Sequence, residues 1–432
     1  MKYISVNFKN QKILVREVKQ EDVSDVWRWR NDKIARANSL DVRRISFQKH
    51  KSWFVRQLRN NKVKIYIATI KKMKIGMVRF DFVGKNTIEI SINMNPTYRG
   101  KGLGKRVLKK MSKFMRQEYP RRIQKAIIKS ANFVSERIFS STQFIKVYEV
   151  DKPAYSVWIK KVPSYRPLRI FFMGNNWLGW KIANWLHQRN EQIVGLGLHP
   201  KEKQKYGKQI IESVKISHAH IFDGSQLKKQ KVINAIKKLK PDFGLSAFFG
   251  YILDQEFINL FPAGCVNLHT AFLPNNRGAH PNVWSIAERT PAGASIHYID
   301  KGVDTGNIIA REQLAVNLTD TGASLYVKLE RLAFNLFKRV WPLIRSGQLH
   351  GIRQNKREGS FHMLRDLKDI DKIDLNRSYE AKQLINILRA RTFPPHAGAY
   401  YEENGQKIYL QLQLLEEKDL KKEKINGNFY KN

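Results

Sequence analysis

Residues 169–198, RIFFMGNNWLGWKIANWLHQRNEQIVGLGL, decide the fold on which the larger part of the chain is built. Two short apolar runs, 169–174 and 193–198, flank a segment, 177–188, whose apolar residues recur at helical spacing. A strand, a helix and a second strand in this order are typical of an α/β domain that opens a parallel sheet. Gly174 and Asn175, which follow the first run, do not form a dinucleotide fingerprint, so no NAD site is predicted.

The regions on either side of this unit predict separate domains. Residues 163–167, PSYRP, contain two prolines and disfavour a continuous helix or strand, so we place a linker there. It separates a domain at 1–162 from a catalytic domain at 168–350. The remainder, 351–432, contains a helical run and then a Glu-Asn-Gly turn between alternating apolar runs, which predicts a hairpin in a small β-rich subdomain with a solvated tail.

Composition restricts the partners and the compartment. The 432 residues include 79 Lys and Arg against 37 Asp and Glu, a formal net charge of +42 that is spread along the whole chain. This spread favours polyanionic small ligands over nucleic acid. Cys265 is the single cysteine, the first residues, MKYISVNFKNQK, lack the apolar core of a signal peptide, and charges interrupt every apolar run. We therefore expect a cytoplasmic protein without membrane contact, and no metal site, because no convergent ligand set is recognisable.

Three side chains suit an acyl transfer. In residues 264–286, GCVNLHTAFLPNNRGAHPNVWSI, Asn267 and His269 stand two apart on a strand-like segment and so share a face. In residues 297–309, HYIDKGVDTGNII, Asp304 lies in a glycine-bracketed turn. An amide or a protonated imidazole can stabilise the negative charge that grows on a carbonyl oxygen attacked by an amine. A carboxylate can accept the surplus proton of the amine or fix the state of the imidazole.

The same two stretches resemble the folate-dependent formyltransferase family, which includes the methionyl-tRNA, glycinamide ribonucleotide and sugar N-formyltransferases. The resemblance extends from residue 168 to the end of the chain. It implies that Asn267, His269 and Asp304 are catalytic and that 10-formyltetrahydrofolate is the donor. It also implies a folate site on residues 245–262, LSAFFGYILDQEFINLFP, and on the loop that ends at Asp304. The residues implied for folate are Phe249, Gly250, Ile252, Leu253, Asp300, Gly302 and Val303.

The acceptor is suggested by residues 275–286 and 389–400, which resemble enzymes that act on nucleotide-linked amino sugars. The candidate acceptor contacts are Arg277, His280, Asn282, Trp284, Arg389 and Arg391, the last two for a phosphate. In the alternative reading, Trp284 is a core aromatic residue and the arginines are solvated helix residues. Initiator tRNA is the rival acceptor, which the positive charge would favour.

The first domain contains a glycine-rich turn between a strand and a basic helix. In residues 93–111, NMNPTYRGKGLGKRVLKKM, amide hydrogens near the helix start can hold a pyrophosphate. Residues 13–162 resemble the GNAT acetyltransferases, which implies acetyl-CoA. The implied contacts are Ile92, Met94, Arg99, Gly100, Gly102, Leu103, Gly104 and Asn132. Phe139 stands where many relatives carry the tyrosine that protonates the thiolate, so another group or water serves, or the domain binds without acetylating.

Residues 29–54 resemble the acetyltransferases of pseudaminic-acid synthesis, which act on a UDP-linked 4-amino-4,6-dideoxy sugar. An ordinary amphipathic helix pair, with Trp29, His50 and Trp53 in its core or rim, is the alternative. We therefore predict an α/β chain: a GNAT domain, then a Rossmann-like formyltransferase domain, then a small β-rich subdomain.

The predicted function is formylation of a nucleotide-linked amino-deoxy sugar of the pseudaminic type, with or without acetylation by the first domain. The alternatives are a methionyl-tRNA formyltransferase and a formyltransferase with a non-catalytic GNAT module. The expected partner is the nucleotide-amino-sugar substrate, nucleic acid and membrane are not expected, and a homodimer is compatible with the sequence.

Overall fold

The computed structural model describes residues 4–8, 11–84, 86–120, 122–151, 154–160, 168–347, 351–355 and 357–417. The chain divides into two compact units, Met1–Ser164 and Tyr165–Asn432, and each is described by itself. The linker predicted at 163–167 and the tail predicted at 418–432 lie outside the described residues.

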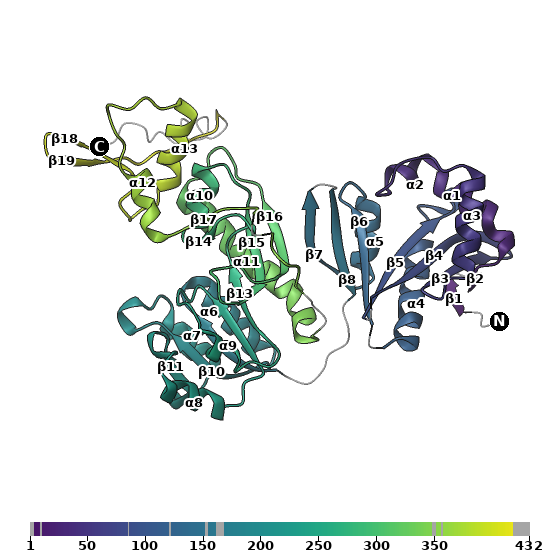
Figure 1. Cartoon of the computed structure of the whole chain (residues 1–432), viewed down its shortest axis with the longest axis horizontal. Helices are drawn as coiled ribbons and strands as arrows, with labels where there is room; N and C mark the ends of the chain where they lie inside the picture. Colours follow the sequence, from purple (N-terminus) through teal and green to yellow (C-terminus); the bar gives the residue numbers. More distant parts are fainter. Residues whose placement is uncertain are drawn as a thin grey trace. The chain divides into compact units, whose positions relative to one another are not determined.

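The first unit is built on an eight-stranded sheet in the order β1-β2-β3-β4-β5-β6-β8-β7 (Figure 1). Its strands are β1 (Ile4–Phe8), β2 (Gln11–Glu17), β3 (Val63–Ile70), β4 (Met73–Val83), β5 (Thr87–Met94), β6 (Ile123–Lys129), β7 (Phe144–Asp151) and β8 (Ala154–Lys160). Its helices are α1 (Val23–Asn31), α2 (Lys33–Ala37), α3 (Phe47–Leu58), α4 (Leu103–Glu118) and α5 (Phe133–Ser141). The amphipathic α4 buries Val107 and Met111 against Ile90 on one face of the sheet. On the other face, Trp29 of α1 and Phe54 of α3 form a second core.

The parallel pairing between β5 and β6 is short. Only Thr87–Glu89 pair with Ile123–Lys125, although β5 continues to Met94. One backbone edge of residues 90–94 therefore has no partner strand in the described sheet. Backbone groups on such an edge must be satisfied by water or by a ligand.

The second unit contains a seven-stranded sheet in the order β11-β10-β9-β12-β13-β15-β16. Its strands are β9 (Arg169–Gly174), β10 (Gln192–Leu198), β11 (Ile221–Asp223), β12 (Phe243–Ala247), β13 (Cys265–His269), β15 (Ala292–Tyr298) and β16 (Ile308–Leu314). Its main helices are α6 (Asn176–Gln188), α7 (Gly207–Val214), α8 (Gln230–Lys238), α9 (Gln255–Ile258), α10 (Pro281–Ala287) and α11 (Gly322–Arg345). The strand, helix and strand predicted in residues 169–198 are confirmed as β9, α6 and β10.

The prediction of a parallel sheet is wrong at one edge. The strands from β11 to β13 are parallel, but β15 is antiparallel to β13, and β16 is antiparallel to β15. The connection from β15 to β16 is too short for a parallel crossover, which needs a dozen or more residues, so β16 has to be antiparallel to β15. The connection from β13 to β15 is longer, and its length does not impose the antiparallel direction.

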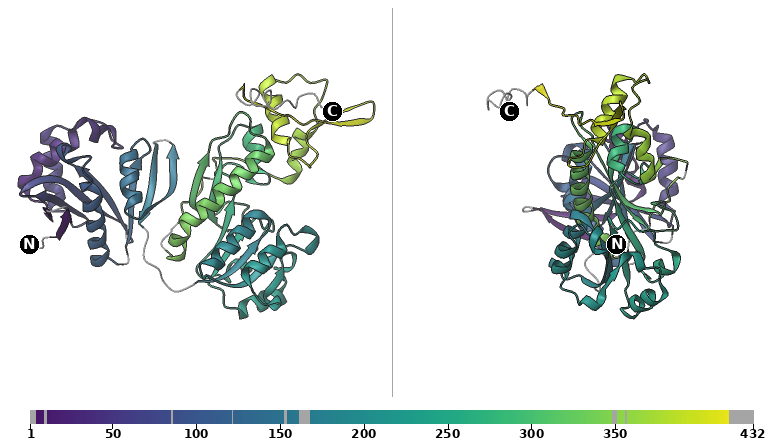
Figure 2. Two further views of the ribbon diagram at one scale, coloured as in Figure 1. Left: turned by 180° about the vertical axis from the view of Figure 1, so that it is seen from behind. Right: turned by 90° about the vertical axis from the view of Figure 1, so that its left-hand side faces the viewer.

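Helices cover both faces of this sheet. On one face, α6 and the long α11 pack side by side (Figure 2). Trp341 of α11 meets Phe243 of β12 with 5.9 Å between ring centroids. On the other face, Ile236 of α8 and Phe257 of α9 surround Phe171 of β9. Helices therefore cover the central strands on both faces, and ligands of such sheets bind at the carboxyl ends of the strands.

The remaining elements form a small C-terminal subdomain. They are α12 (Lys368–Asp371), α13 (Ala381–Arg391), β18 (Tyr400–Glu403) and β19 (Gln406–Tyr409), while the two-residue strands β14 (Arg277–Gly278) and β17 (Phe361–His362) pair in parallel. The predicted hairpin is confirmed, because β18 and β19 are antiparallel around Asn404 (φ 49°) and Gly405 (φ 76°). These two residue types tolerate the left-handed backbone that such a turn requires.

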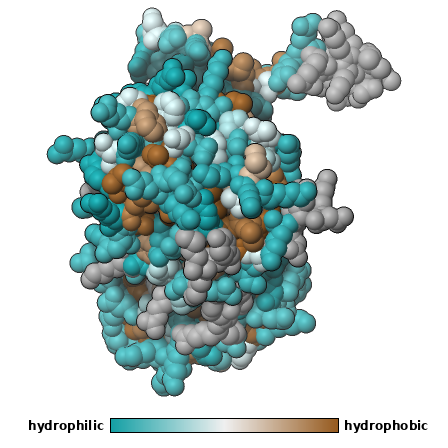
Figure 3. Space-filling model, turned by 90° about the vertical axis from the view of Figure 1, so that its right-hand side faces the viewer, coloured by the Kyte–Doolittle hydropathy of each residue, from teal (hydrophilic) through white to brown (hydrophobic). Residues whose placement is uncertain are grey.

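Hydrophilic side chains cover most of the face in Figure 3, interrupted by smaller hydrophobic patches. Among the described residues, no helix combines the length and the apolar character that crossing a bilayer would need.

Cys265 in β13 offers a test of this fold. Its side chain is 2% exposed, and burial raises the pKa of its thiol above the ordinary range. The thiolate is the reactive form, so we expect no maleimide labelling of the native protein and rapid labelling in denaturant, measured by mass spectrometry with glutathione as the control thiol. Equal labelling rates in the two conditions would contradict this placement of β13.

Candidate active site

The three predicted catalytic side chains, Asn267, His269 and Asp304, meet near the carboxyl end of β13, an interior strand of the seven-stranded sheet. Nδ2 of Asn267 donates to Oδ1 of Asp304 at 3.3 Å, and Nε2 of His269 lies 3.5 Å from Oδ2 of the same carboxylate. The side chains of His269 and Asp304 are only 10% and 12% exposed. The structure therefore joins an amide, an imidazole and a carboxylate in one sheltered cluster.

Local structure explains the positions of the three side chains. Asn267 and His269 alternate with buried residues along β13, so both point to the same face. Asp304 has a positive φ of 53°, which a short polar side chain tolerates. The turn around it is held by Gln354, whose Nε2 donates to the carbonyl oxygens of Asp304 and Gly306 at 2.7 Å each.

Sequence reasoning missed His297 and Ser246. Nε2 of His297 lies 3.2 Å from Oδ1 of Asp304, while its Nδ1 donates to the carbonyl oxygen of Tyr298 at 2.9 Å. The hydroxyl of Ser246 donates to Oδ1 of Asn267 at 2.9 Å, which turns the amide nitrogen toward the carboxylate.

His297 is the first residue of the stretch 297–309 that contains Asp304. The antiparallel register of β13 and β15 places His297 directly opposite Asn267. The prediction of a parallel sheet did not include this pairing.

The carboxylate of Asp304 is held in its ionised form. Burial by itself would raise its pKa, but His269, His297 and the N–H of Gly278, which donates to Oδ2 at 3.0 Å, outweigh that effect and hold the pKa well below its usual range.

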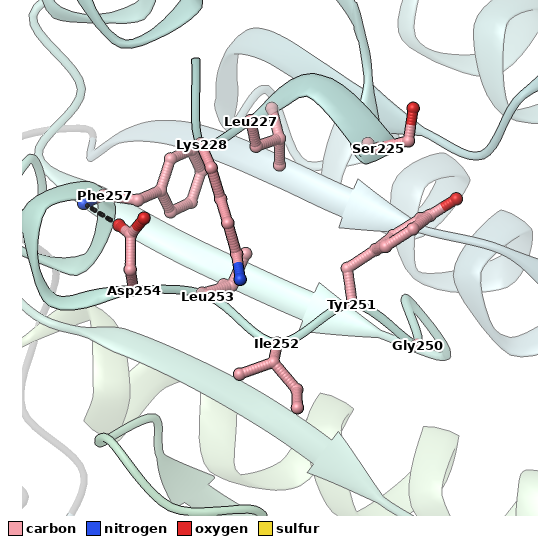
Figure 4. A pocket seen from close by; sticks show the side chains of 10 residues that line it. Ser225, Leu227, Lys228, Gly250, Tyr251, Ile252, Leu253, Asp254 and Phe257 are labelled. Atoms are coloured by element: carbon pink, nitrogen blue, oxygen red, sulfur yellow. Dashed lines mark hydrogen bonds between the residues drawn. The ribbon is translucent and has the colours of Figure 1, made fainter. Parts of the chain in front are cut away.

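The residues predicted for folate divide into two groups. Gly250, Ile252 and Leu253 line a cavity of about 410 Å³ at the carboxyl end of β12, next to the strand that carries Asn267. Figure 4 shows the side chain of Lys228 extending across this cavity toward Leu253 and Ile252. Phe249 is only 2% exposed and packs against His199 in the core, so only its backbone is available to a ligand.

The second group, Asp300, Gly302 and Val303, does not line this cavity. It forms the turn that carries Asp304. Oδ1 of Asp300 accepts hydrogen bonds from the N–H of Gly302 at 3.1 Å and from the hydroxyl of Thr305 at 2.6 Å.

Several predicted acceptor contacts are buried. Trp284 is 5% exposed and stacks on His362 with 4.0 Å between ring centroids, while Nδ2 of Asn282 donates to the carbonyl oxygen of Gly322 at 2.9 Å. Packing of α10 against α11 and α13 turns both side chains inward. The structure therefore favours a role in the core for Trp284 and Asn282. Of the remaining candidates, His280 is exposed and Arg277 is partly buried.

The two predicted phosphate-binding arginines are engaged within the protein. Arg389 donates to three backbone carbonyl oxygens just before α11, at 2.9–3.0 Å, and Arg391 pairs with the carboxylate of Asp371. The alternative of a solvated helix residue is wrong for Arg389, which is 7% exposed, and phosphate binding by the two arginines stays a prediction.

In the first unit, the glycine-rich turn lies at the start of α4. Gly100 and Gly102 both have φ of 74°, and α4 begins at Leu103 without a side-chain cap. Gly104 is packed closely, since a Cβ there would lie 3.3 Å from the side chain of Met94. Ile92 and Met94 lie on the stretch of β5 that pairs with β4 on one edge and is not paired with β6 on the other.

The other predicted acetyl-CoA contacts have internal partners. Arg99 pairs with Asp32 and donates from Nε to the carbonyl oxygen of Met94 at 3.1 Å, and Asn132 caps α5 by accepting from the N–H of Ser135 at 3.1 Å.

Phe139, Trp29 and His50 are buried, and Trp53 is half-buried. Phe139 is 3% exposed and packs edge-on against Phe144. Trp29 and His50 are buried, and Trp53 packs beside them, as in the amphipathic helix pair that was the alternative reading.

The buried charge of Asp304 predicts a pH dependence of stability. A carboxylate whose folded pKa is depressed stabilises the fold above its unfolded pKa of about 3.9, and this stabilisation is lost as the pH falls below that value. The unfolding free energy of the wild type should therefore fall more steeply between about pH 5 and pH 2 than that of Asp304→Asn, measured by urea titration. Asp369→Asn, at an exposed site on α12, is the control and should keep the wild-type slope.

Comparison with known proteins assigns families to both units. Residues 169–341 match the formyl transferase model, residues 366–417 the N-formyltransferase dimerization C-terminal domain, and residues 27–143 the acetyltransferase (GNAT) family.

Similar proteins cover most of the second unit. A methionyl-tRNA formyltransferase of Alkaliphilus oremlandii is 28% identical over 248 residues, which are 56% of this chain and 79% of that protein. A methionyl-tRNA formyltransferase of Myxococcus xanthus is 32% identical over 187 residues, which are 43% and 58% of the two chains. The crystal structure of a 4-N formyltransferase from Francisella tularensis is 28% identical with a TM-score of 0.51, over 58% of this chain and 98% of that one. The chain is therefore a transferase that joins a GNAT-family acetyltransferase domain to a domain of the formyl transferase family.

Proposed function

We propose that the second unit transfers a formyl group from 10-formyltetrahydrofolate to the amine of a nucleotide-linked amino sugar. The observation that carries this proposal is the convergence of Asn267, His269 and Asp304, and a cavity lies at the carboxyl end of β12, the strand next to β13. Ligands of α/β sheets bind at the carboxyl ends of the strands, which is where both features lie.

Each group of the cluster has a role in the transfer. The amine nitrogen bonds to the formyl carbon, the bond from that carbon to the folate nitrogen breaks, and one proton passes from the amine to the folate nitrogen. Asn267 and protonated His269 donate hydrogen bonds to the formyl oxygen as negative charge grows on it. Asp304 keeps the positive charge on His269 and receives the proton of the amine, which becomes strongly acidic once the new bond forms. His297 holds the carboxylate in place.

The cavity near β12 fits part of a folate. Leu253 and Phe257 supply apolar surface, the backbone of Gly250 and Ile252 supplies polar groups along an edge, and Lys228 supplies a positive charge for a carboxylate. A flat ring with an acidic tail needs these three features together.

The proposal also names the acceptor, a nucleotide-linked amino sugar. Likeness to a 4-N formyltransferase supports formylation of an amine, and the match of residues 366–417 to an N-formyltransferase dimerization domain supports the same reaction and a homodimer. The resemblance of residues 275–286 and 389–400 to enzymes that act on nucleotide-linked amino sugars favours an amino sugar as the acceptor. The resemblance of residues 29–54 to pseudaminic-pathway acetyltransferases favours a UDP-4-amino-4,6-dideoxy sugar. Likeness to methionyl-tRNA formyltransferases keeps the tRNA acceptor as the second candidate.

One acceptor screen tests the proposal. The protein is incubated with 10-formyltetrahydrofolate and, separately, with UDP- and dTDP-linked amino sugars and methionyl-tRNA, and the products are weighed. We expect formylation of a UDP-4-amino-4,6-dideoxy sugar. We expect kcat to fall about 10²–10⁴-fold in His269→Gln and Asp304→Asn, which remove proton-handling groups, and about 10²–10³-fold in Asn267→Ala, which removes an oxyanion donor.

His218→Gln changes an exposed histidine of the same unit and should keep the wild-type kcat. Formylation of methionyl-tRNA with no reaction on any amino sugar would replace the preferred acceptor.

We further infer that the first unit binds acetyl-CoA at the turn formed by Gly100–Gly104. The first amides of the 16-residue α4 are not capped by a side chain, and a helix start of this kind suits a pyrophosphate. The unpaired edge of β5 beside it can pair with the amide groups of the pantetheine arm. Because Phe139 has no proton to give, acetyl transfer would need water or another group, and binding without transfer is the alternative.

Gly102→Ala tests the acetyl-CoA site. A Cβ at φ 74° is strained and shifts the amides at the start of α4, so we expect the Kd for acetyl-CoA, measured by calorimetry, to rise about tenfold or more. Gly84→Ala is the matched control, because Gly84 has φ of 57° with open space around it, and it should bind as the wild type does. Equal weakening in both variants would point to a general effect of strain and count against the site.

A further inference from the structure

Asn276 lies seven residues after His269 and is fully buried, with a left-handed backbone of φ 55°. Its carboxamide makes three hydrogen bonds: Nδ2 donates to the hydroxyls of Ser285 at 2.9 Å and Thr290 at 2.8 Å, and Oδ1 accepts from the hydroxyl of Ser360 at 2.9 Å. Its N–H donates to the same Ser360 oxygen at 2.9 Å. Asn276 therefore connects three segments that are distant in the sequence.

The backbone next to this side chain contacts two of the three candidate catalytic groups. The carbonyl oxygen of Asn276 accepts from Nε2 of His269 at 3.1 Å, and the N–H of Gly278 donates to Oδ2 of Asp304 at 3.0 Å. The placement of residues 276–278 therefore sets how the imidazole faces the carboxylate.

The segment is also held from the C-terminal side. The N–H of Arg277 donates to the carbonyl oxygen of Ser360 at 3.0 Å, and that of Ala279 to the carbonyl oxygen of His362 at 2.8 Å. A Cβ at Gly278 would lie 2.2 Å from the His362 oxygen, so the two strands approach as closely as a glycine allows. Ser360 is thus the point at which the C-terminal part of the unit reaches the cluster.

We propose that Asn276, together with Ser360, is a positioning residue that orients His269 and Asp304 for formyl transfer. A carbonyl oxygen only accepts hydrogen bonds, so the Asn276 carbonyl holds a proton on Nε2 of His269 in both the neutral and the protonated ring, and the proton that His269 gains for formyl transfer lies on Nδ1. Loss of the carboxamide leaves the carbonyl free to move and lets the imidazole change tautomer and tilt. This inference rests on the proposed formyl transfer and assigns to that site two residues that touch no substrate.

The test combines kinetics with a spectrum. Asn276→Gly keeps the left-handed backbone but removes the side chain, Ser360→Ala removes the hydroxyl, and Ser360→Thr retains one. A displacement of about 1 Å costs about 100-fold, so we expect kcat to fall by about that factor in Asn276→Gly, with the KM for 10-formyltetrahydrofolate changed less than about threefold. We expect a fall of about tenfold in Ser360→Ala and recovery in Ser360→Thr. The two changes share one bond, from the hydroxyl of Ser360 to Oδ1 of Asn276, so the double variant should be slowed by less than the product of the two single effects.

Nitrogen-15 spectra of the histidines, assigned through His269→Gln, supply a readout without substrate. The wild type should show a protected Nε2 proton on His269, and Asn276→Gly should show mixed tautomers and a shifted titration. Gln124→Ala is the control, because Gln124 and Ser112 form a similar buried amide and hydroxyl pair in the first unit, and it should leave formyl transfer and the His269 spectrum unchanged.

The inference is overturned if Ser360→Ala and Asn276→Gly keep kcat within about threefold, if their effects multiply as for independent sites, or if the His269 spectrum does not change. If Asn276→Gly fails to fold, Ser360→Ala and its threonine rescue still decide the question. A wild type that formylates no acceptor would refute the proposed function, while the spectrum would still decide whether Asn276 orients His269.

Discussion

The second unit depends on one buried negative charge, the carboxylate of Asp304. An ionised carboxylate out of water is costly unless every lone pair has a donor. Here Nδ2 of Asn267 and the N–H of Gly278 donate hydrogen bonds to it, and Nε2 of His269 and Nε2 of His297 lie 3.5 and 3.2 Å from its oxygens. Because these groups belong to β13, β14 and β15, the charge can be accommodated only when all three strands are correctly placed.

This requirement explains the mixed topology of the sheet. The parallel strands β9 to β13 bring their carboxyl ends together and form the edge on which the cavity lies. The antiparallel β15 then returns along β13 and sets His297 opposite Asn267. A wholly parallel sheet would supply the cavity without the second imidazole. The C-terminal part of the unit completes the site, since Gln354 and Ser360 hold the turns on which Asp304 and Asn276 lie.

The two units share a chemical theme. Each belongs to a family that moves an acyl group, and both proposed donors, a folate and an acetyl-CoA, carry negative charges. The formal net charge of +42 suits such ligands and a nucleotide-linked acceptor, through attraction that needs no specific basic patch. In each unit the proposed ligand binds backbone groups at the end of a strand or the start of a helix. The amides at such positions have no hydrogen-bond partner within the strand or helix.

The sequence alone determined the architecture of both units, because hydrophobic periodicity and turn residues are local properties: the β9, α6 and β10 segments and the Asn404–Gly405 hairpin follow from them directly. It also identified Asn267, His269 and Asp304, since their motifs are contiguous. Tertiary structure alone decided the rest. His297 became a neighbour of the cluster through strand pairing, Asn276 and Ser360 met across 84 residues of sequence, and Trp284 and Arg389 turned inward as helices packed. Contacts of this kind depend on which surfaces are buried together, and no local pattern in a single sequence encodes that choice.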